Sequence, residues 1–150
     1  HLKEVIRMKT QIKKRVLSLV SQYHTQDPVE LAESLNILVL FEDLGQIGGY
    51  YNTAYRQKMI HINDRLSDPM RKFTAAHELG HALLHSHMNT TFLRTNTCFS
   101  VDAFERQANI FAAYLLISDE DLRENAHLTQ EQYARLLGYP QQFIELRLSL

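Results

Sequence analysis

The spacing of hydrophobic residues changes twice along the chain, which predicts helices, then strands, then helices again. Residues 2–23 carry apolar side chains three or four positions apart, and this is the period of an amphipathic helix. Later helices are predicted where a capping residue or a proline precedes a similar pattern. Their predicted starts are Asp27-Pro28, Asp68-Pro69, Ser100, Ser118, Thr129 and Pro140, with ends near Leu35, His87, Ile117 and Gly138.

Strands are predicted between the second and third of these helices. Residues 37–41 form a continuous apolar run that is typical of a buried strand, residues 47–52 contain a Gly-Gly pair, and residues 58–62 alternate. Three short strands in close succession predict a small, mostly antiparallel meander. A small sheet with helices on both sides of it in sequence indicates the α+β class rather than repeated βαβ units.

The chain has no internal repeat and no linker rich in Pro, Gly or Ser. It therefore predicts one compact domain over residues 1–150, with a helical hairpin of residues 129–150 as part of it. The 150 residues are 45% hydrophobic and 22% charged, as in ordinary globular proteins. Their net charge of −1 argues against a strongly basic nucleic-acid-binding protein or a polybasic membrane protein.

The location of the protein is predicted from what the sequence lacks. No apolar run approaches the 18 residues of a membrane span, and the first twenty residues do not show the pattern of a signal peptide. The single cysteine, Cys98, cannot form an intramolecular disulfide and fits a reducing compartment. We therefore expect a cytoplasmic protein with no membrane segment.

The most informative motif is His77-Glu78-Leu79-Gly80-His81, an HExxH pattern. Residues four apart share one face of a helix, so two imidazoles can bind one ion. The glutamate between them can act as the general base on a water molecule at that ion, and zinc suits such ligands. The predicted helix is apolar on most sides, which indicates burial, and buried histidines and a glutamate need a partner such as a metal.

A catalytic zinc usually takes three protein ligands, and two residues compete for the third place. His85 shares the face of His81, but three imidazoles at positions i, i+4 and i+8 of one straight helix span about 12 Å, too far for one ion. Glu105, early in the next helix, is the better candidate, although an exposed acid at a helix start explains it equally well. Asn109 lies one turn later and can accept the N–H of a ligating histidine.

The runs FTAAHELGHALLH from Phe73 and ERQANIFAAYLL from Glu105 resemble the ImmA/IrrE-like metallopeptidases of phages, conjugative elements and bacteria. The stretches DPVELAESLNILVL, GQIGGYY, KMIHIND and LTQEQYARLLGYP extend the resemblance in order along the chain. The resemblance implies one zinc ion on His77, His81 and Glu105, with Glu78 as the catalytic carboxylate. It also implies cleavage of a helix-turn-helix repressor of a prophage or mobile element, with an antirepressor or activator protein as a further partner.

The family also resembles the wider zincin class, in which an edge strand aligns the substrate. By that resemblance the strand Met59, Ile60, His61 and Ile62 takes this role. A donor that polarises the scissile carbonyl is expected as well. The sequence leaves four candidates for it, namely Tyr50, Tyr51, His61 and His127.

Three alternatives stay open at this point. The hairpin of residues 129–137 and 140–148 has the length of a helix-turn-helix, but its few charges do not favour DNA binding. Cys98 has no local signature of an activated nucleophile. Finally, the protein could be a metal-containing regulatory module that sequesters a repressor without cutting it, although an intact Glu78 disfavours a purely structural metal.

Overall fold

A computed structural model describes residues 1–86 and 100–150, without the side chains of residues 100–102. The helices are α1 (Leu2–Tyr23), α2 (Pro28–Ser34), α3 (Asp68–Leu84), α5 (Ser100–Leu116), α6 (Asp119–Glu124), α7 (Gln130–Leu137) and α8 (Gln141–Leu148). The strands are β1 (Leu38–Glu42), β2 (Gly49–Ala54) and β3 (Gln57–Asn63). This order of helices, a small sheet and further helices confirms the α+β class. None of the described helices is long and apolar enough to cross a membrane.

The predicted capping residues set most helix ends. Asp27 accepts hydrogen bonds from the backbone N–H groups of the first turn of α2, and Pro28 follows it as predicted. Ser118 and Thr129 each form a capping box with the residue three positions later. Gly138 ends α7 in the left-handed conformation, with φ of 79°.

Helix α3 differs by a few residues from its prediction. Ser67, rather than Asp68, is the N-cap of α3, because its hydroxyl accepts a hydrogen bond from the backbone N–H of Met70. The helix ends at Leu84, with His85 as its C-cap, and not near His87. His87 and Cys98 lie outside the described residues, as does the side chain of Ser100.

The sheet is mixed, so the predicted antiparallel meander is wrong. Its strand order is β1-β3-β2, with β3 parallel to β1 and antiparallel to β2. The tight turn at Tyr55 and Arg56, both with positive φ, folds β3 back against β2. This hairpin inserts β3 between its neighbours and makes β1 an edge strand. Leu38 and Phe41 of β1 are each 48% exposed, so residues 37–41 do not form the expected buried strand.

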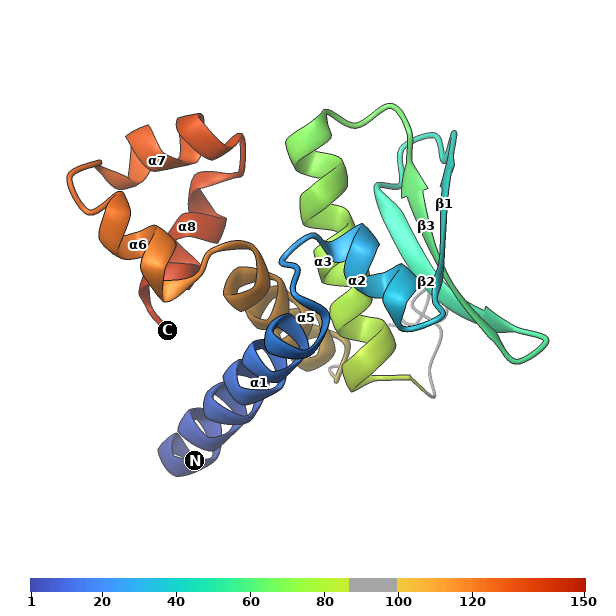
Figure 1. Cartoon of the computed structure of the whole chain (residues 1–150), viewed down its shortest axis with the longest axis horizontal. Helices are drawn as coiled ribbons and strands as arrows, with labels where there is room; N and C mark the ends of the chain where they lie inside the picture. The colour runs from blue at the N-terminus through green and yellow to red at the C-terminus, as the bar shows by residue number, and fades with distance from the viewer. Residues whose placement is uncertain (87–99) are drawn as a thin grey trace.

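Helices cover one face of the sheet (Figure 1). Ile60 and Ile62 of β3 and Tyr51 of β2 point to this face and are fully buried. Helix α3 packs against β2 and β3 on one side and against α5 on the other, so it lies in the middle of the core. A Cβ at Gly80 would lie 3.2 Å from the backbone of Ala108, which shows how closely α3 and α5 approach.

The C-terminal helices pack onto the same hydrophobic cluster. Phe143 and Ile144 of α8 are buried, and Phe143 contacts Phe73 of α3 edge-to-face, with ring centroids 4.7 Å apart. The buried Arg147 donates hydrogen bonds from Nε to the carbonyl oxygen of Ile117 and from its guanidinium to Asp119, both at 2.6 Å. Helices α6, α7 and α8 lie together at the end of the molecule opposite the sheet (Figure 1).

Two adjacent glycines provide a test of the contact between β2 and α3. A Cβ at Gly49 would lie 2.6 Å from the His61 carbonyl oxygen and 2.6 Å from Cγ2 of Thr74, whereas one at Gly48 meets nothing closer than 3.9 Å. We expect Gly49→Ala to lower the free energy of unfolding by about 1–3 kcal/mol through overpacking. Gly48→Ala is the matched control, and urea unfolding of both variants checks this. Equal stabilities would mean that β2 does not lie this close to α3.

Candidate metal centre and active site

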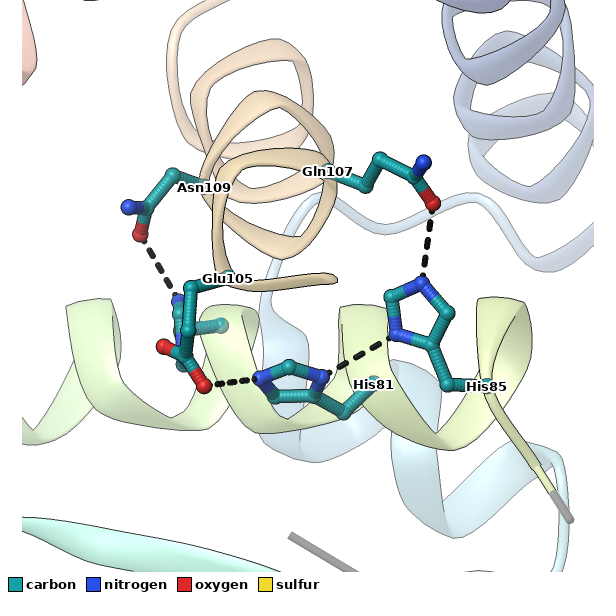
Figure 2. A network of polar contacts seen from close by, with 6 residues as sticks. His81, His85, Glu105, Gln107 and Asn109 are labelled. Carbon is teal, nitrogen blue, oxygen red and sulfur yellow. Dashed lines mark hydrogen bonds and ion pairs between the residues drawn. The ribbon is translucent and has the colours of Figure 1, made fainter. Parts of the chain in front are cut away.

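Three potential metal ligands converge between α3 and α5. His77 and His81 lie one turn apart on α3, and Glu105 reaches them from the first turns of α5. The Nε2 atom of His77 lies 2.9 Å from Oε2 of Glu105, and Nε2 of His81 lies 2.9 Å from Oε1. The donor atoms of these residues all lie within 4.8 Å of one another. The predicted ligand set is therefore brought together, with two imidazoles against one carboxylate. Figure 2 shows the contact between Glu105 and His81.

The Nδ1 atoms of His77 and His81 also contact neighbouring side chains. Nδ1 of His77 lies 2.8 Å from the side-chain oxygen of Asn109, which is the role expected for Asn109 from the sequence. Nδ1 of His81 lies 3.1 Å from Nδ1 of His85, whose Nε2 lies 2.9 Å from the side-chain oxygen of Gln107. Figure 2 shows this chain running from α3 back to α5. The Nε2 atoms of His77 and His81 thus point to Glu105 while Nδ1 of each is fixed by a neighbour.

This arrangement bears on the choice between His85 and Glu105. His85 lies on the Nδ1 side of His81, whereas Glu105 lies on the Nε2 side, so the two cannot complete one site with His81 Nε2. His85 also stands outside the group of residues whose donor atoms cluster. Gln107 was not singled out from the sequence, because it follows Glu105 by two positions and so projects from a different side of α5.

Glu105 and His77 shift each other's pKa. Burial raises the pKa of Glu105, but its hydrogen bonds with His77 and His81 and their charges lower that pKa well below its usual range. Burial lowers the pKa of His77, whereas its hydrogen bond to Glu105 and the negative charges of Glu78 and Glu105 raise it above its usual value. The cluster therefore combines an ionised carboxylate with imidazoles, a donor set in which both kinds of group bind divalent metals.

The donor set fits zinc in geometry as well as in chemistry. Zinc bonds of about 2.0–2.2 Å in a tetrahedral site place donor atoms about 3.3–3.5 Å apart. The 2.9 Å separations of the Glu105 oxygens from the imidazole nitrogens are slightly shorter than this, and all the donor atoms lie within 4.8 Å of one another, so small shifts of the three side chains would bring them around one ion. Nδ1 of His77 contacts the side-chain oxygen of Asn109, and Nδ1 of His81 contacts His85, which in turn contacts Gln107. Histidines that bind a metal usually make outer contacts of this kind.

A cavity of about 340 Å³ opens beside these ligands, within the size range of small-molecule sites. It is lined by Gly48, Gly49, Phe73, Thr74, His77, Glu78, Glu105 and Asn109. Glu78 is fully buried and forms part of the inner wall next to His77. The residue predicted as the general base thus lines the same cavity as the candidate ligands His77 and Glu105.

The strand predicted to align the substrate is not an edge strand. Met59, Ile60, His61 and Ile62 belong to β3, which pairs with β1 on one side and with β2 on the other. Both of its edges are occupied, so it cannot add a substrate as a further strand. The correction follows from the strand order, which the hydrophobic pattern does not encode. Strand β2 is the edge strand that reaches the cavity, through Gly49.

None of the four side chains predicted as polarising donors lines this cavity. His61 stacks on Tyr50 and hydrogen bonds to Glu42 and Asn52 on the sheet face opposite Ile60 and Ile62. The Tyr51 hydroxyl donates to the carbonyl oxygen of Ser86. His127 precedes α7, near the C-terminal helices.

Comparison with known proteins agrees with this geometry. The chain matches the family model of a peptidase family described as the IrrE N-terminal-like domain, over residues 32–149. The chain belongs to this family. Every site residue predicted from the sequence, from Met59 to Asn109, lies inside the region that matches the IrrE N-terminal-like domain.

Two relatives of the chain are similar over most of their length. An immunity region protein of Bacillus phage phi105 is 40% identical over 141 residues, which cover 92% of this chain and 89% of the relative. Metallopeptidase ImmA of Bacillus subtilis (strain 168) is 34% identical over 146 residues, which cover 92% of this chain and 84% of the relative. Together with family membership, these relatives support a metallopeptidase.

Proposed function

We propose that the protein is a zinc-dependent endopeptidase that hydrolyses a peptide bond in a cytoplasmic protein. The observation that carries the proposal is the convergence of His77, His81 and Glu105 beside a cavity that His77 and Glu105 line together with the buried Glu78. His77, His81 and Glu105 hold one zinc ion per chain. The purely structural role for a metal is disfavoured, because a structural site is usually closed by four protein ligands and has no cavity beside it.

Each residue has a defined task in this reaction. A bound zinc would polarise the scissile carbonyl and lower the pKa of an adjacent water. Glu78 removes a proton from the attacking water as its oxygen forms a bond to the carbonyl carbon. The same carboxyl then gives the proton to the amide nitrogen as the carbon–nitrogen bond breaks, which releases one product with a new carboxyl group and one with a new amino group. Glu78 is fully buried and lines the cavity, so its carboxylate is kept away from bulk water.

The outer contacts orient the ligands for this task. A histidine that binds zinc through Nε2 carries its proton on Nδ1, so His77 donates to the side-chain oxygen of Asn109. In the same way His81 donates to Nδ1 of His85, and His85 donates through Nε2 to the side-chain oxygen of Gln107. Gln107 therefore acts on the metal site through His85, although it contacts no ligand directly.

Loss of the acceptor at residue 107 tests this chain of hydrogen bonds. We expect Gln107→Leu to weaken zinc binding measurably, but by no more than the roughly 10–100-fold that follows loss of a direct contact of a ligating histidine, because Gln107 acts on His81 only through His85. Gln107→Glu keeps an acceptor oxygen at the same place and is expected to keep most of the affinity. Competition with a zinc-binding dye measures both variants. Wild-type affinity in Gln107→Leu would show that the chain does not orient His81.

We also propose that the substrate binds in an extended conformation along the outer edge of β2. Peptidases often bind substrate as an added strand, because backbone hydrogen bonds give affinity without demanding one sequence. Strand β2 is at the edge of the sheet, and its first residue, Gly49, lines the cavity that holds Glu78. A substrate on this edge lies next to the candidate metal ligands. Strand β2 therefore takes the role in substrate alignment that the sequence predicted for β3.

The proposed substrate is the helix-turn-helix repressor of a prophage or mobile element, and the proposed further partner is an antirepressor or activator protein. The relatives support this choice, since one is an immunity region protein of a phage and another is a metallopeptidase. The near-neutral net charge of −1 and the few charges in α7 and α8 do not support direct DNA binding.

Incubation of the zinc-loaded protein with a helix-turn-helix repressor encoded beside it tests the substrate. We expect two new fragments in mass spectrometry, and we expect no fragments after zinc is removed with a chelator, because the ion supplies the polarising charge. The Glu78→Gln variant is the matched control for a contaminating protease. Stable binding of an intact repressor by the wild type, with no fragments, would instead favour the module that sequesters a repressor without cutting it.

A further inference from the structure

A second, smaller cavity lies next to the one that holds the candidate metal ligands. Its volume is about 160 Å³, and it is lined by Phe73, Asn109, Pro140, Gln142, Phe143 and Leu146. Phe73 and Asn109 also line the larger cavity, so these two side chains form a wall that the neighbouring cavities share. Because Phe73 precedes His77 by one helical turn and Asn109 hydrogen bonds to His77, the smaller cavity begins directly beside a candidate ligand.

The walls of the smaller cavity are apolar and firmly placed. Phe143 is only 4% exposed, and its ring packs edge-to-face on Phe73. Pro140 and Leu146 complete the apolar part of the wall, and both flank Phe143 on or next to α8. The hydrophobic cluster behind them holds α8 against α5, so the cavity is built into the fold.

The lining and the size limit what this cavity can accept. Its polar lining side chains, Asn109 and Gln142, are both neutral, so a charged group placed there would lose its hydration without a partner. A cavity of roughly 150 Å³ lined by apolar side chains accepts a molecule the size of benzene. The space of about 160 Å³ therefore suits one side chain of the size of leucine, methionine or phenylalanine.

We propose that this cavity is a specificity pocket for an apolar side chain of the residue that flanks the scissile bond of the substrate. The inference rests on the proposed peptidase function and adds the kind of residue that is cut. A peptide bond placed beside Glu78, His77 and Glu105 lies in the larger cavity, and Phe73 and Asn109 of that cavity also line the smaller one, which the neighbouring side chain would occupy. Helix α8 thereby determines part of the cleavage specificity, through Gln142 and Leu146.

The test uses the zinc-loaded full chain and a mixture of peptides from a digested bacterial proteome, with cleavage positions read by mass spectrometry. We expect Leu, Met or Phe to be enriched at one of the two positions that flank the cut bond. Peptides matched except for Leu or Ala at that position then give two values of kcat/KM. Their ratio is expected to be about tenfold or more in favour of Leu, the discrimination that an apolar pocket provides.

Two tryptophan variants of α8 link this preference to the cavity. Gln142→Trp places a large ring at the exposed rim and is expected to lower the Leu-to-Ala ratio about tenfold. Gln141→Trp is the matched control, because Gln141 is exposed on the same helix but does not line the cavity, and its ratio should equal that of the wild type. A third variant, Leu146→Ala, widens the pocket and should move the preference from Leu toward Phe.

The outcomes distinguish failure of the specificity pocket from failure of the proposed peptidase function. Cleavage with no residue preference beside the cut bond, or equal ratios in Gln142→Trp and Gln141→Trp, would overturn the specificity pocket and leave the peptidase function standing. Failure of the wild type to cut any peptide or the repressor would overturn the proposed function and, with it, the pocket.

Discussion

Replacement of Glu78 by glutamine is expected to leave zinc bound and to lower the rate of cleavage by about 10²–10⁴-fold or more, the usual effect of losing a general acid–base group. Glutamine has nearly the shape of glutamate but cannot accept a proton from water. Because Glu78 is not one of the three residues whose donor atoms cluster, its replacement removes no candidate ligand. Elemental analysis measures the zinc content, and kcat/KM on the repressor or a cleaved peptide measures the rate.

The control for this result is Glu33→Gln, which makes the same chemical change at an exposed position of α2. Its rate and zinc content should match those of the wild type. Near-normal cleavage by Glu78→Gln would rule out Glu78 as the base.

The sequence predicted the local part of the site better than the part that depends on packing. His77 and His81 lie four residues apart on one helix, so their proximity follows from helix geometry alone. Glu105 depends on how α5 lies against α3, and spacing left it no better than an ordinary helix-start acid. The one sign of this packing in the sequence is Gly80, because a Cβ there would lie 3.2 Å from the backbone of Ala108.

The arrangement of the strands was not predictable from the pattern of the chain. Hydrophobic spacing tells which face of a strand is buried but not which strand lies beside it. The apolar residues 37–41 therefore indicated a buried strand, whereas Leu38, Leu40 and Phe41 lie exposed on the edge strand β1. The substrate was predicted to bind along β3 for the same reason, since a central strand cannot be distinguished from an edge strand before the strand order is known.

Of the side chains that contact the candidate ligands from outside, one could be predicted from the sequence and another could not. Asn109 lies four residues after Glu105 and so shares its face of α5, and this periodicity indicated its position next to His77. Gln107 lies about 200° around the helix from Glu105, at 100° per residue, and only the crossing of the two helices brings it to His85. Side chains that act across a helix pair therefore require the structure, even where the ligands themselves do not.

Replacement of Glu105 by alanine is expected to weaken zinc binding by more than the roughly 10–100-fold that follows loss of an outer contact, since it removes a direct ligand. Two imidazoles from one helix then remain of the three donor groups that converge here. Cleavage should fall together with zinc content, in contrast to Glu78→Gln, in which cleavage alone is lost. Elemental analysis and titration with zinc in the presence of a competing chelator measure the loss.

A thermal unfolding experiment separates loss of zinc from loss of folding. A ligand that binds only the folded protein stabilises it by about 2.7 kcal/mol at 100 times its Kd, so zinc should raise the thermal midpoint of the wild type. It should not raise that of Glu105→Ala at the same zinc concentration, whereas Glu124→Ala, an exposed acid at the end of α6, should respond like the wild type. Full zinc content in Glu105→Ala would remove Glu105 from the donor set. His85 could not take its place, because its Nδ1 faces Nδ1 of His81, on the side of that ring opposite to Nε2.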